Sequence, residues 1–285
     1  TTTHYASTSE ALRVILKEPL RHRPGERHFY ATGSYTVIAG VMEHAARLDY
    51  HSLMRRHVID PLGLKSTVPN DRKAIIPHRT AFYVREGDRA VNAPYFDPSF
   101  KWAGAGYLST AEDMNRFMRV LANSVRGRGG LGLSPQHARS FTAHAVPSDT
   151  PGMTYGNGLM HTGEAGRAYL HHTGGMLSFS SSFHVDVASG VGAFASSTLN
   201  AFAEYRPRLL TRFAVDALTN ALSGRPLPSP PSLQMPLASA ASYVGRYVGP
   251  AGSFEVRLGA PLTIERSQDE EKDVRQLTEK FTKLV

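Results

Sequence analysis

One serine–lysine pair and one glycine run have residue types that could carry chemistry. Ser99 and Lys101 combine a hydroxyl nucleophile with an amine base, but residues two apart do not face each other on a helix. No serine in the chain is followed by lysine three residues later. Gly127, Gly129 and Gly132 match the G-x-G-x-x-G pattern of dinucleotide-binding loops. They follow a predicted helix rather than a strand, so we expect no dinucleotide site there.

Other nucleophile and metal patterns are missing from the sequence. There is no cysteine, no G-x-S-x-G turn and no G-x-x-x-x-G-K-S/T loop. The 13 histidines never fall at the close spacing that zinc ligands on one helix require. We therefore expect neither a metal nor another cofactor.

The elements that would position a site alternate between helices and strands. A capping box at Ser7 and Glu10 opens a first helix, and a second at Ser109 and Glu112 opens another that reaches about residue 122. Apolar spacing predicts further helices over residues 35–48, 51–59 and 201–222, and a small-residue loop over 102–107. Extended segments are predicted over residues 81–95, 179–187 and 192–198.

The C-terminal part differs in composition from the rest. Residues 225–236 contain five prolines, which indicates a stiff linker. Short strand-like runs follow over residues 241–264, and Ser267 with Glu270 opens a predicted amphipathic helix to Val285. The sequence thus predicts a main domain over residues 1–224, a linker over 225–236 and a small β module over 237–285 that ends in that helix.

Five segments together resemble one family, the penicillin-recognising serine hydrolases. Its β-lactamase-like branch includes class C-type esterases and mitochondrial serine β-lactamase-like members. The segments are PGERHFYATGSY at 24–35, DPLGL at 60–64, KWAGAGYLSTAED at 101–113, YGNGL at 155–159 and HTGG at 172–175. The family patterns that they resemble include P-G-x-x-F-x-Y-S-N-x-x-Y, D-P-L-G-M, Y-G-x-G-W and K/H-T/S-G-G. Each is weak alone, but their order and spacing are specific.

The resemblance implies an α/β (α+β) fold of the β-lactamase/transpeptidase type, with helices packed on an antiparallel sheet. It implies a serine hydrolase in which the serine of an S-x-x-K motif attacks an ester, peptide or β-lactam carbonyl and forms an acyl-enzyme. That motif lies well upstream of the tyrosine motif in the family, and only 29 residues precede Tyr30 here. We expect the nucleophile segment and the first strands of the sheet to lie outside this sequence.

Two residues would be catalytic by resemblance. Tyr30 matches the tyrosine of the second motif and would be the proton shuttle, which requires nearby cations to stabilise a phenolate. His172 stands where the third motif usually has lysine, and a histidine carries a full charge only below its ordinary pKa of about 6.5. Its neighbour His171 faces the opposite way on a strand, so either histidine could be the one at the site.

Five further residues would contact substrate by resemblance. Thr32 replaces the usual asparagine, which removes a paired donor and acceptor. Thr173, Gly174 and Gly175 would form the substrate-binding strand edge, with a backbone N–H toward the acyl oxygen. Trp102 would line the pocket, although a packed core aromatic is an equal alternative.

Charge and hydropathy limit the partners. Lys and Arg number 32 against 24 Asp and Glu, giving +8, but the cationic residues are scattered and form no nucleic-acid footprint. No apolar run approaches the ~18 residues of a membrane span. We expect a small-molecule or peptide substrate, no nucleic acid, and as partner either the missing N-terminal fragment or further copies of the chain. The alternatives are an inactive binding or assembly module and a basic surface that binds polyanions. The resemblance allows a periplasmic, secreted or mitochondrial location.

Overall fold

The computed structural model describes residues 2–86, 89–130, 132–143, 145–164, 166–176, 178–198, 207–231, 241, 244–249, 252–257, 263–266 and 282–284. The chain divides into two compact units. The first extends to Pro228 and contains the main sheet with its helices. The second comprises residues 201–206 and 229–285 and contains four short strands.

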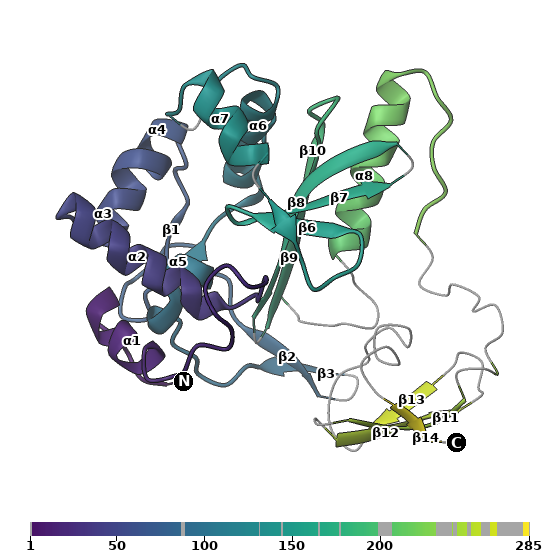
Figure 1. Ribbon diagram of the computed structural model, residues 1–285, viewed down its shortest axis with the longest axis horizontal. Helices are drawn as coiled ribbons and strands as arrows, with labels where there is room; N and C mark the ends of the chain where they lie inside the picture. The colour runs from purple at the N-terminus through teal and green to yellow at the C-terminus, as the bar shows by residue number, and fades with distance from the viewer. Residues whose placement is uncertain are drawn as a thin grey trace. The chain divides into compact units, whose positions relative to one another are not determined.

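The main sheet has six antiparallel strands in the order β10-β9-β8-β7-β6-β5 (Figure 1). The expected strands at residues 179–187 and 192–198 are confirmed as β9 and β10. The family-like segment at 155–159 forms the hairpin between β6 and β7, where Asn157 and Gly158 both have positive φ, as a tight turn of this hand requires. The bounds are β5 Val146–Pro147, β6 Met153–Gly156, β7 Leu159–Glu164, β8 Arg167–Met176, β9 Phe179–Asp186 and β10 Gly192–Ser197.

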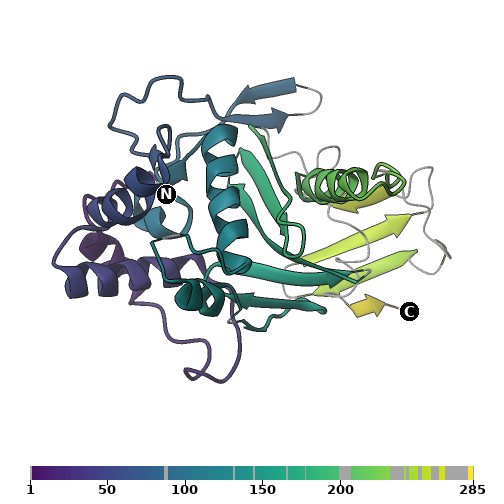
Figure 2. The same ribbon diagram turned by 90° about the horizontal axis from the view of Figure 1, so that it is seen from above.

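Helices cover both faces of this sheet. Helix α6 (Ala111–Val125), with α7 (Pro135–Ala143) beside it, lies on one face, and α8 (Pro207–Leu222) lies on the other, as Figure 2 shows from above. On the α6 face, buried Met118 and Leu121 pack on buried residues of β7, β8 and β9. Because side chains alternate along a strand, β8 presents Leu170 and His172 to this face and Tyr169 and His171 to α8.

A layer of further helices precedes the sheet in the chain. Helix α1 (Thr8–Ile15) packs closely on α2 (Thr32–Ala46), because any side chain at Gly40 would come within 2.6 Å of Leu12. The remaining elements are α3 Tyr50–Met54, a π-helical turn Arg55–Ile59, α4 Asp60–Leu62, a 3₁₀ turn Ser99–Lys101 and α5 Trp102–Ala105.

Several predicted boundaries in this layer were wrong. Helix α2 begins at Thr32, three residues early, because packing on α1 and α5 outweighs the low helix propensity of Gly33. The cap of α6 is Thr110, whose side chain accepts from the Asp113 N–H, one residue later than predicted. Residues 102–105, predicted as a loop, form α5. The helix predicted over 51–59 widens into the π turn directly before Pro61, which lacks the N–H of a regular turn.

Two small antiparallel pairs complete the first unit. The extended segment predicted at residues 81–95 contains the hairpin β2 (Tyr83–Glu86) and β3 (Arg89–Asn92). The pair β1 (Val68–Pro69) and β4 (Tyr107–Leu108) joins the segment that follows α4 to the segment that follows α5. The described part of the predicted linker, residues 225–231, forms neither helix nor strand.

The second unit is a four-stranded antiparallel sheet in the order β13-β12-β11-β14. Its strands are β11 Gly245–Gly249, β12 Gly252–Arg257, β13 Thr263–Arg266 and β14 Thr282–Leu284. The helix predicted from Ser267 falls largely outside the described residues. At its end the prediction was wrong, since β14 pairs with β11. The open edge of β11 needs hydrogen-bond partners, and apolar spacing over a short run does not distinguish helix from strand.

In the described part of the chain, no helix has the length and apolar character needed to cross a membrane.

Candidate active site

The structure brings Tyr30 and His172 together, with Tyr155 as a third member. Tyr30 lies in the extended segment ahead of α2, Tyr155 on β6 and His172 on β8. The ring centroids of Tyr30 and His172 are 6.0 Å apart, and those of Tyr30 and Tyr155 are 5.7 Å apart at 84°. The Tyr155 and His172 rings are 5.9 Å apart. We call these three side chains the Tyr–His cluster.

Hydrogen bonds extend the cluster from the helical layer to the sheet. The Tyr155 hydroxyl lies 2.7 Å from that of Tyr35 on α2 and 3.4 Å from Nε2 of His172. Nδ1 of His172 lies 2.7 Å from the carbonyl oxygen of Thr173. Both nitrogens of His172 therefore have a partner within the chain.

Sequence reasoning missed Tyr35, Tyr155 and His28 as members of this region. The His28 ring is 5.2 Å from Tyr155, and its Nδ1 lies 3.8 Å from the exposed Asp149 carboxylate. All three residues stand inside the family-like segments at 24–35 and 155–159. The signal was available in those segments, but only the fold shows that they meet.

The cluster is uncharged near neutral pH. Burial, followed by the neighbouring Tyr35, raises the pKa of the Tyr30 phenol, although 44% of Tyr30 is exposed. Burial and the Tyr35 hydroxyl raise the pKa of Tyr155 far above the ordinary phenol value. Burial lowers the pKa of His172, and the Thr173 carbonyl offsets part of that shift. A Tyr30 phenolate would need a cation that is not found among the contacts of the described cluster.

The end of β8 offers an open backbone edge. Thr173, Gly174 and Gly175 pair with three serines of β9, and both glycines are exposed. A side chain at Gly174 would come 2.5 Å from the Ser181 hydroxyl, so it would require that hydroxyl to move. A side chain at Gly175 would meet nothing within 4 Å. Open space therefore lies beside the Gly175 Cα.

Thr32 is the first residue of α2, two positions after Tyr30. A side chain at Gly104 of α5 would come 2.6 Å from the Thr32 methyl and 2.7 Å from its carbonyl oxygen. This close packing joins α2 to α5 and holds the segment that carries Tyr30.

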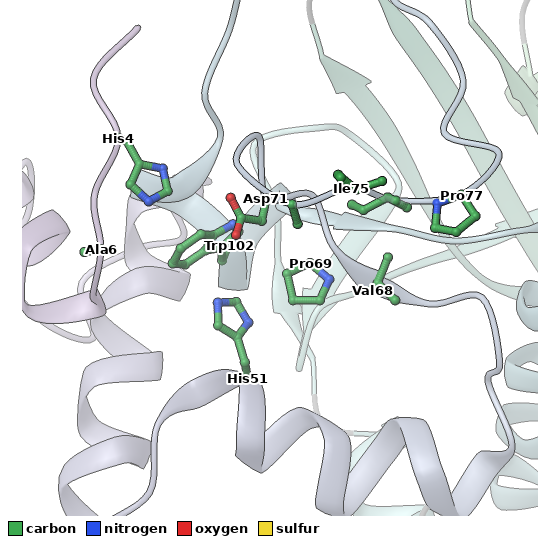
Figure 3. Close-up of a pocket in the computed structure, with 11 residues that line it drawn as sticks. His4, Ala6, His51, Val68, Pro69, Asp71, Ile75, Pro77 and Trp102 are labelled. Carbon is green, nitrogen blue, oxygen red and sulfur yellow. The ribbon is translucent and has the colours of Figure 1, made fainter.

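Trp102, the single tryptophan of the chain, lines a different pocket of about 580 Å³ (Figure 3). Its ring is 4.4 Å from that of His51 and 6.1 Å from that of His4, and no described ring contact joins it to Tyr30 or His172. Nδ1 of His51 lies 2.8 Å from the Tyr107 hydroxyl. The buried Nε1 of Trp102 has no partner among the described residues.

The Ser99 and Lys101 pair has a structural role. Ser99 is buried, and its hydroxyl accepts a 2.8 Å hydrogen bond from the Tyr5 N–H. The Lys101 ammonium lies over the rings of Phe96 and Phe100. Within the described ranges, no three His, Asp or Glu side chains come together as a metal site.

The fold has helices packed on an antiparallel sheet. Its site places Tyr30 beside strand β8, which carries the T-G-G sequence at residues 173–175. Comparison with known proteins agrees at the level of sequence. The family model described as Beta-lactamase matches residues 1–216, and the chain belongs to the beta-lactamase family. The expected family and fold are thereby confirmed.

Two curated relatives illustrate the similarity. The human "Serine beta-lactamase-like protein LACTB, mitochondrial" is 36% identical over 114 residues, which cover 40% of this chain and 21% of that protein. A "Putative D-alanyl-D-alanine carboxypeptidase" of Salmonella enteritidis PT4 is 28% identical over 56% of this chain and 40% of that protein. The matches thus span well under half the length of these relatives.

Solved structures share the fold at lower identity. A penicillin-binding protein homologue from Pyrococcus abyssi, described as octameric, has a TM-score of 0.65 at 19% identity and covers 89% of this chain and 56% of that chain. A D-stereospecific amidohydrolase from Streptomyces sp. has a TM-score of 0.58 at 23% identity over 70% and 58% of the two chains.

Proposed function

We propose that the chain is part of a serine hydrolase that acts through an acyl-enzyme on an ester, peptide or β-lactam bond. The observation that carries the proposal is the meeting of Tyr30 with His172 beside an open T-G-G strand edge. In this proposal Tyr30 and His172 are catalytic, and Thr32 holds the Tyr30 segment at the substrate side. Gly174 and Gly175 form the edge along which the substrate lies.

The nucleophile comes, in this proposal, from polypeptide outside these 285 residues. No S-x-x-K motif is present in the sequence, and Ser99 is buried in a structural contact. A lysine beside such a serine would supply the cation that the Tyr–His cluster lacks. That cation would favour the Tyr30 phenolate, which the neutral surroundings disfavour.

The chemical steps follow from these groups. The serine oxygen bonds to the substrate carbonyl carbon, and its proton passes to the lysine or to Tyr30. The bond to the leaving group breaks as that group takes the proton, and water then releases the acyl chain. A backbone N–H at the end of β8 would donate to the carbonyl oxygen as negative charge develops on it.

Names of relatives support the bond types in the proposal. The human relative is called β-lactamase-like, the Salmonella relative a carboxypeptidase and the Streptomyces neighbour an amidohydrolase. Each of these names describes attack on an acyl carbon. The Trp102 pocket is a separate candidate for substrate contact, because Trp102 carries a buried donor without a described partner.

The test is covalent labelling with a fluorophosphonate probe, read by intact mass. The 285-residue chain should take up no adduct, and a longer protein containing these residues and an S-x-x-K segment should take up one. In that longer protein Tyr30→Phe should slow labelling by about a hundredfold, as loss of a general base does. The matched control Tyr83→Phe, on β2, should label at the wild-type rate. An adduct on the 285-residue chain would place the nucleophile within it and overturn this part of the proposal.

A second candidate is an inactive binding or assembly module on the same fold. It is favoured by the missing S-x-x-K motif together with the threonine at 32 and the histidine at 172. The Pyrococcus neighbour is described as octameric, which supports assembly of this chain with further copies. This candidate would be established instead if a longer protein bound acyl ligands but took up no fluorophosphonate adduct. Light scattering should then show a stable oligomer.

A further inference from the structure

We infer that His172 acts as a hydrogen-bond acceptor in the Tyr–His cluster, and that the site therefore selects acyl compounds that are uncharged beside the scissile bond. Esters and amides without an adjacent carboxylate would fit, and compounds with one would be excluded. The inference rests on the proposed function, because it names the substrate class of that same site.

The tautomer of His172 follows from its two partners. A carbonyl oxygen can only accept, so the 2.7 Å contact from Nδ1 to the Thr173 carbonyl requires the proton on Nδ1. A neutral imidazole has one N–H, so Nε2 carries a lone pair and accepts. Any hydrogen bond across the 3.4 Å contact with the Tyr155 hydroxyl therefore runs from that hydroxyl to Nε2.

The surroundings of His172 contain no described group that would hold it as a cation. On the site face it meets the phenols of Tyr30 and Tyr155, with Tyr35 and His28 beyond Tyr155. Its cross-strand neighbour is Phe183. The adjacent His171 faces α8, and Asp149, the carboxylate of this region, lies at the exposed end beside His28. None of these contacts supplies a carboxylate that could stabilise a protonated His172.

A ligand carboxylate would therefore meet a neutral imidazole, whose one N–H is held by the Thr173 carbonyl, where a lysine would offer an ammonium. A charge-assisted bond from lysine to a carboxylate is strong, and a partly buried carboxylate without such a partner is costly. A neutral amide has no such cost, because it carries no charge that needs a counter-ion and its carbonyl can accept from a phenol. The replacement of lysine by histidine thus changes the charge that the site recognises.

A pair of matched ligands tests the inference on the 285-residue chain, without any turnover. Phenylacetylglycinamide and phenylacetylglycine share one apolar body and differ by a terminal carboxylate. Dissociation constants would be measured at pH 8 by chemical-shift titration of the labelled protein. The amide should bind at least about tenfold tighter, a difference of about 1.4 kcal/mol. His172→Lys should reverse the preference, and His172→Gln, which keeps a neutral acceptor, should retain it.

The control adds the same charge elsewhere. His57→Lys, at an exposed position of the π-helical turn, should leave the ratio of the two constants unchanged. Equal or tighter binding of the acid by the wild type, an unchanged ratio in His172→Lys, or binding of neither ligand would overturn the inference. Failure of the proposed function is read separately, because a site that never labels with the probe can still show the predicted preference.

Discussion

Two neighbouring histidines of β8 lie in opposite surroundings. His171 is 0% exposed on the α8 face, where its ring stacks on that of His184 at 4.5 Å and 9°. Neither of its nitrogens has a hydrogen-bond partner among the described residues. His172, on the other face, has both nitrogens engaged and borders an open strand edge. The comparison shows that the residue type did not decide the role, and that the packing on each face did.

The α8 face is held by charged contacts around the histidine pair. Asp216 accepts from Arg167 at 2.8 Å, from Arg212 at 2.9 Å and from the Tyr169 hydroxyl at 2.5 Å. The Arg212 guanidinium also lies 3.8 Å from the Tyr169 ring centroid. Burial lowers the pKa of both His171 and His184 to about 3, and nearby cationic residues of α8 add to the shift. This face is built to keep two imidazoles neutral.

The largest expected effect is acid destabilisation through that pair. Both folded-state pKa values lie below the unfolded value of about 6.5, so the unfolded chain binds more protons as the pH falls. The free energy of unfolding should fall between pH 6.5 and pH 4.5 by roughly 4–5 kcal/mol, about half of it from each histidine. Urea denaturation across this pH range measures the loss.

A variant that removes the titrating pair sharpens the comparison. His171→Leu with His184→Leu should flatten the pH dependence, and His184→Asn alone should remove about half of it. His57→Gln at the surface should leave it unchanged. A wild type as stable at pH 4.5 as at pH 6.5 would show that the α8 face does not penalise imidazolium.

The next effect concerns Asp216, whose side chain is 22% exposed. Asp216→Asn leaves Arg167 and Arg212 without their carboxylate, so we expect a loss of about 2–3 kcal/mol in the free energy of unfolding at pH 7. The control Asp60→Asn breaks an exposed pair with Arg55 and should cost less than about 0.5 kcal/mol. If the two variants lost similar amounts of free energy of unfolding, the Asp216 contacts would contribute no more than an exposed ion pair, and the prediction would be wrong.

On the site face, Tyr155→Phe should have a smaller effect on stability. It removes one hydroxyl that bonds Tyr35 and His172, at a cost of about 1 kcal/mol. Loss of a donor to Nε2 removes support for the neutral imidazole, so the pKa of His172 should rise. Histidine NMR titration measures this shift, and a pKa that falls in Tyr155→Phe would contradict the assigned direction of the hydrogen bond.

The smallest stability effect is expected at Gly175. Gly175→Ala places a methyl group in open space and should change the free energy of unfolding by less than about 0.5 kcal/mol. It should weaken phenylacetylglycinamide binding, because the methyl group occupies the substrate edge. Gly174→Ala collides with Ser181 and should be the more destabilising of the two. If Gly175→Ala bound the ligand as tightly as the wild type, the ligand would not lie along this strand edge.

The sequence predicted the family, strands β9 and β10, and the family-like segments that carry Tyr30 and His172, whose catalytic roles stay predictions. It could do so because these lie in segments with specific spacing. It did not predict that Tyr35 and Tyr155 join them, because their contact depends on how α2 packs against β6. It left open which of His171 and His172 faces the site, since alternation along a strand needs one known neighbour to fix its phase. The end of the chain was misassigned because strand pairing in the second unit is a tertiary effect.

The central claim is that β8 separates a structural histidine from a site histidine held as a neutral acceptor. Long-range ¹H–¹⁵N correlation spectra of the labelled imidazoles at pH 7 test it most directly. We predict that His172 is in the Nδ1–H tautomer and becomes protonated as the pH falls, whereas His171 stays neutral for as long as the chain remains folded. An Nε2–H tautomer or an imidazolium at His172 at pH 7, or protonation of His171 in the folded chain at a pH near 6.5, would contradict the account.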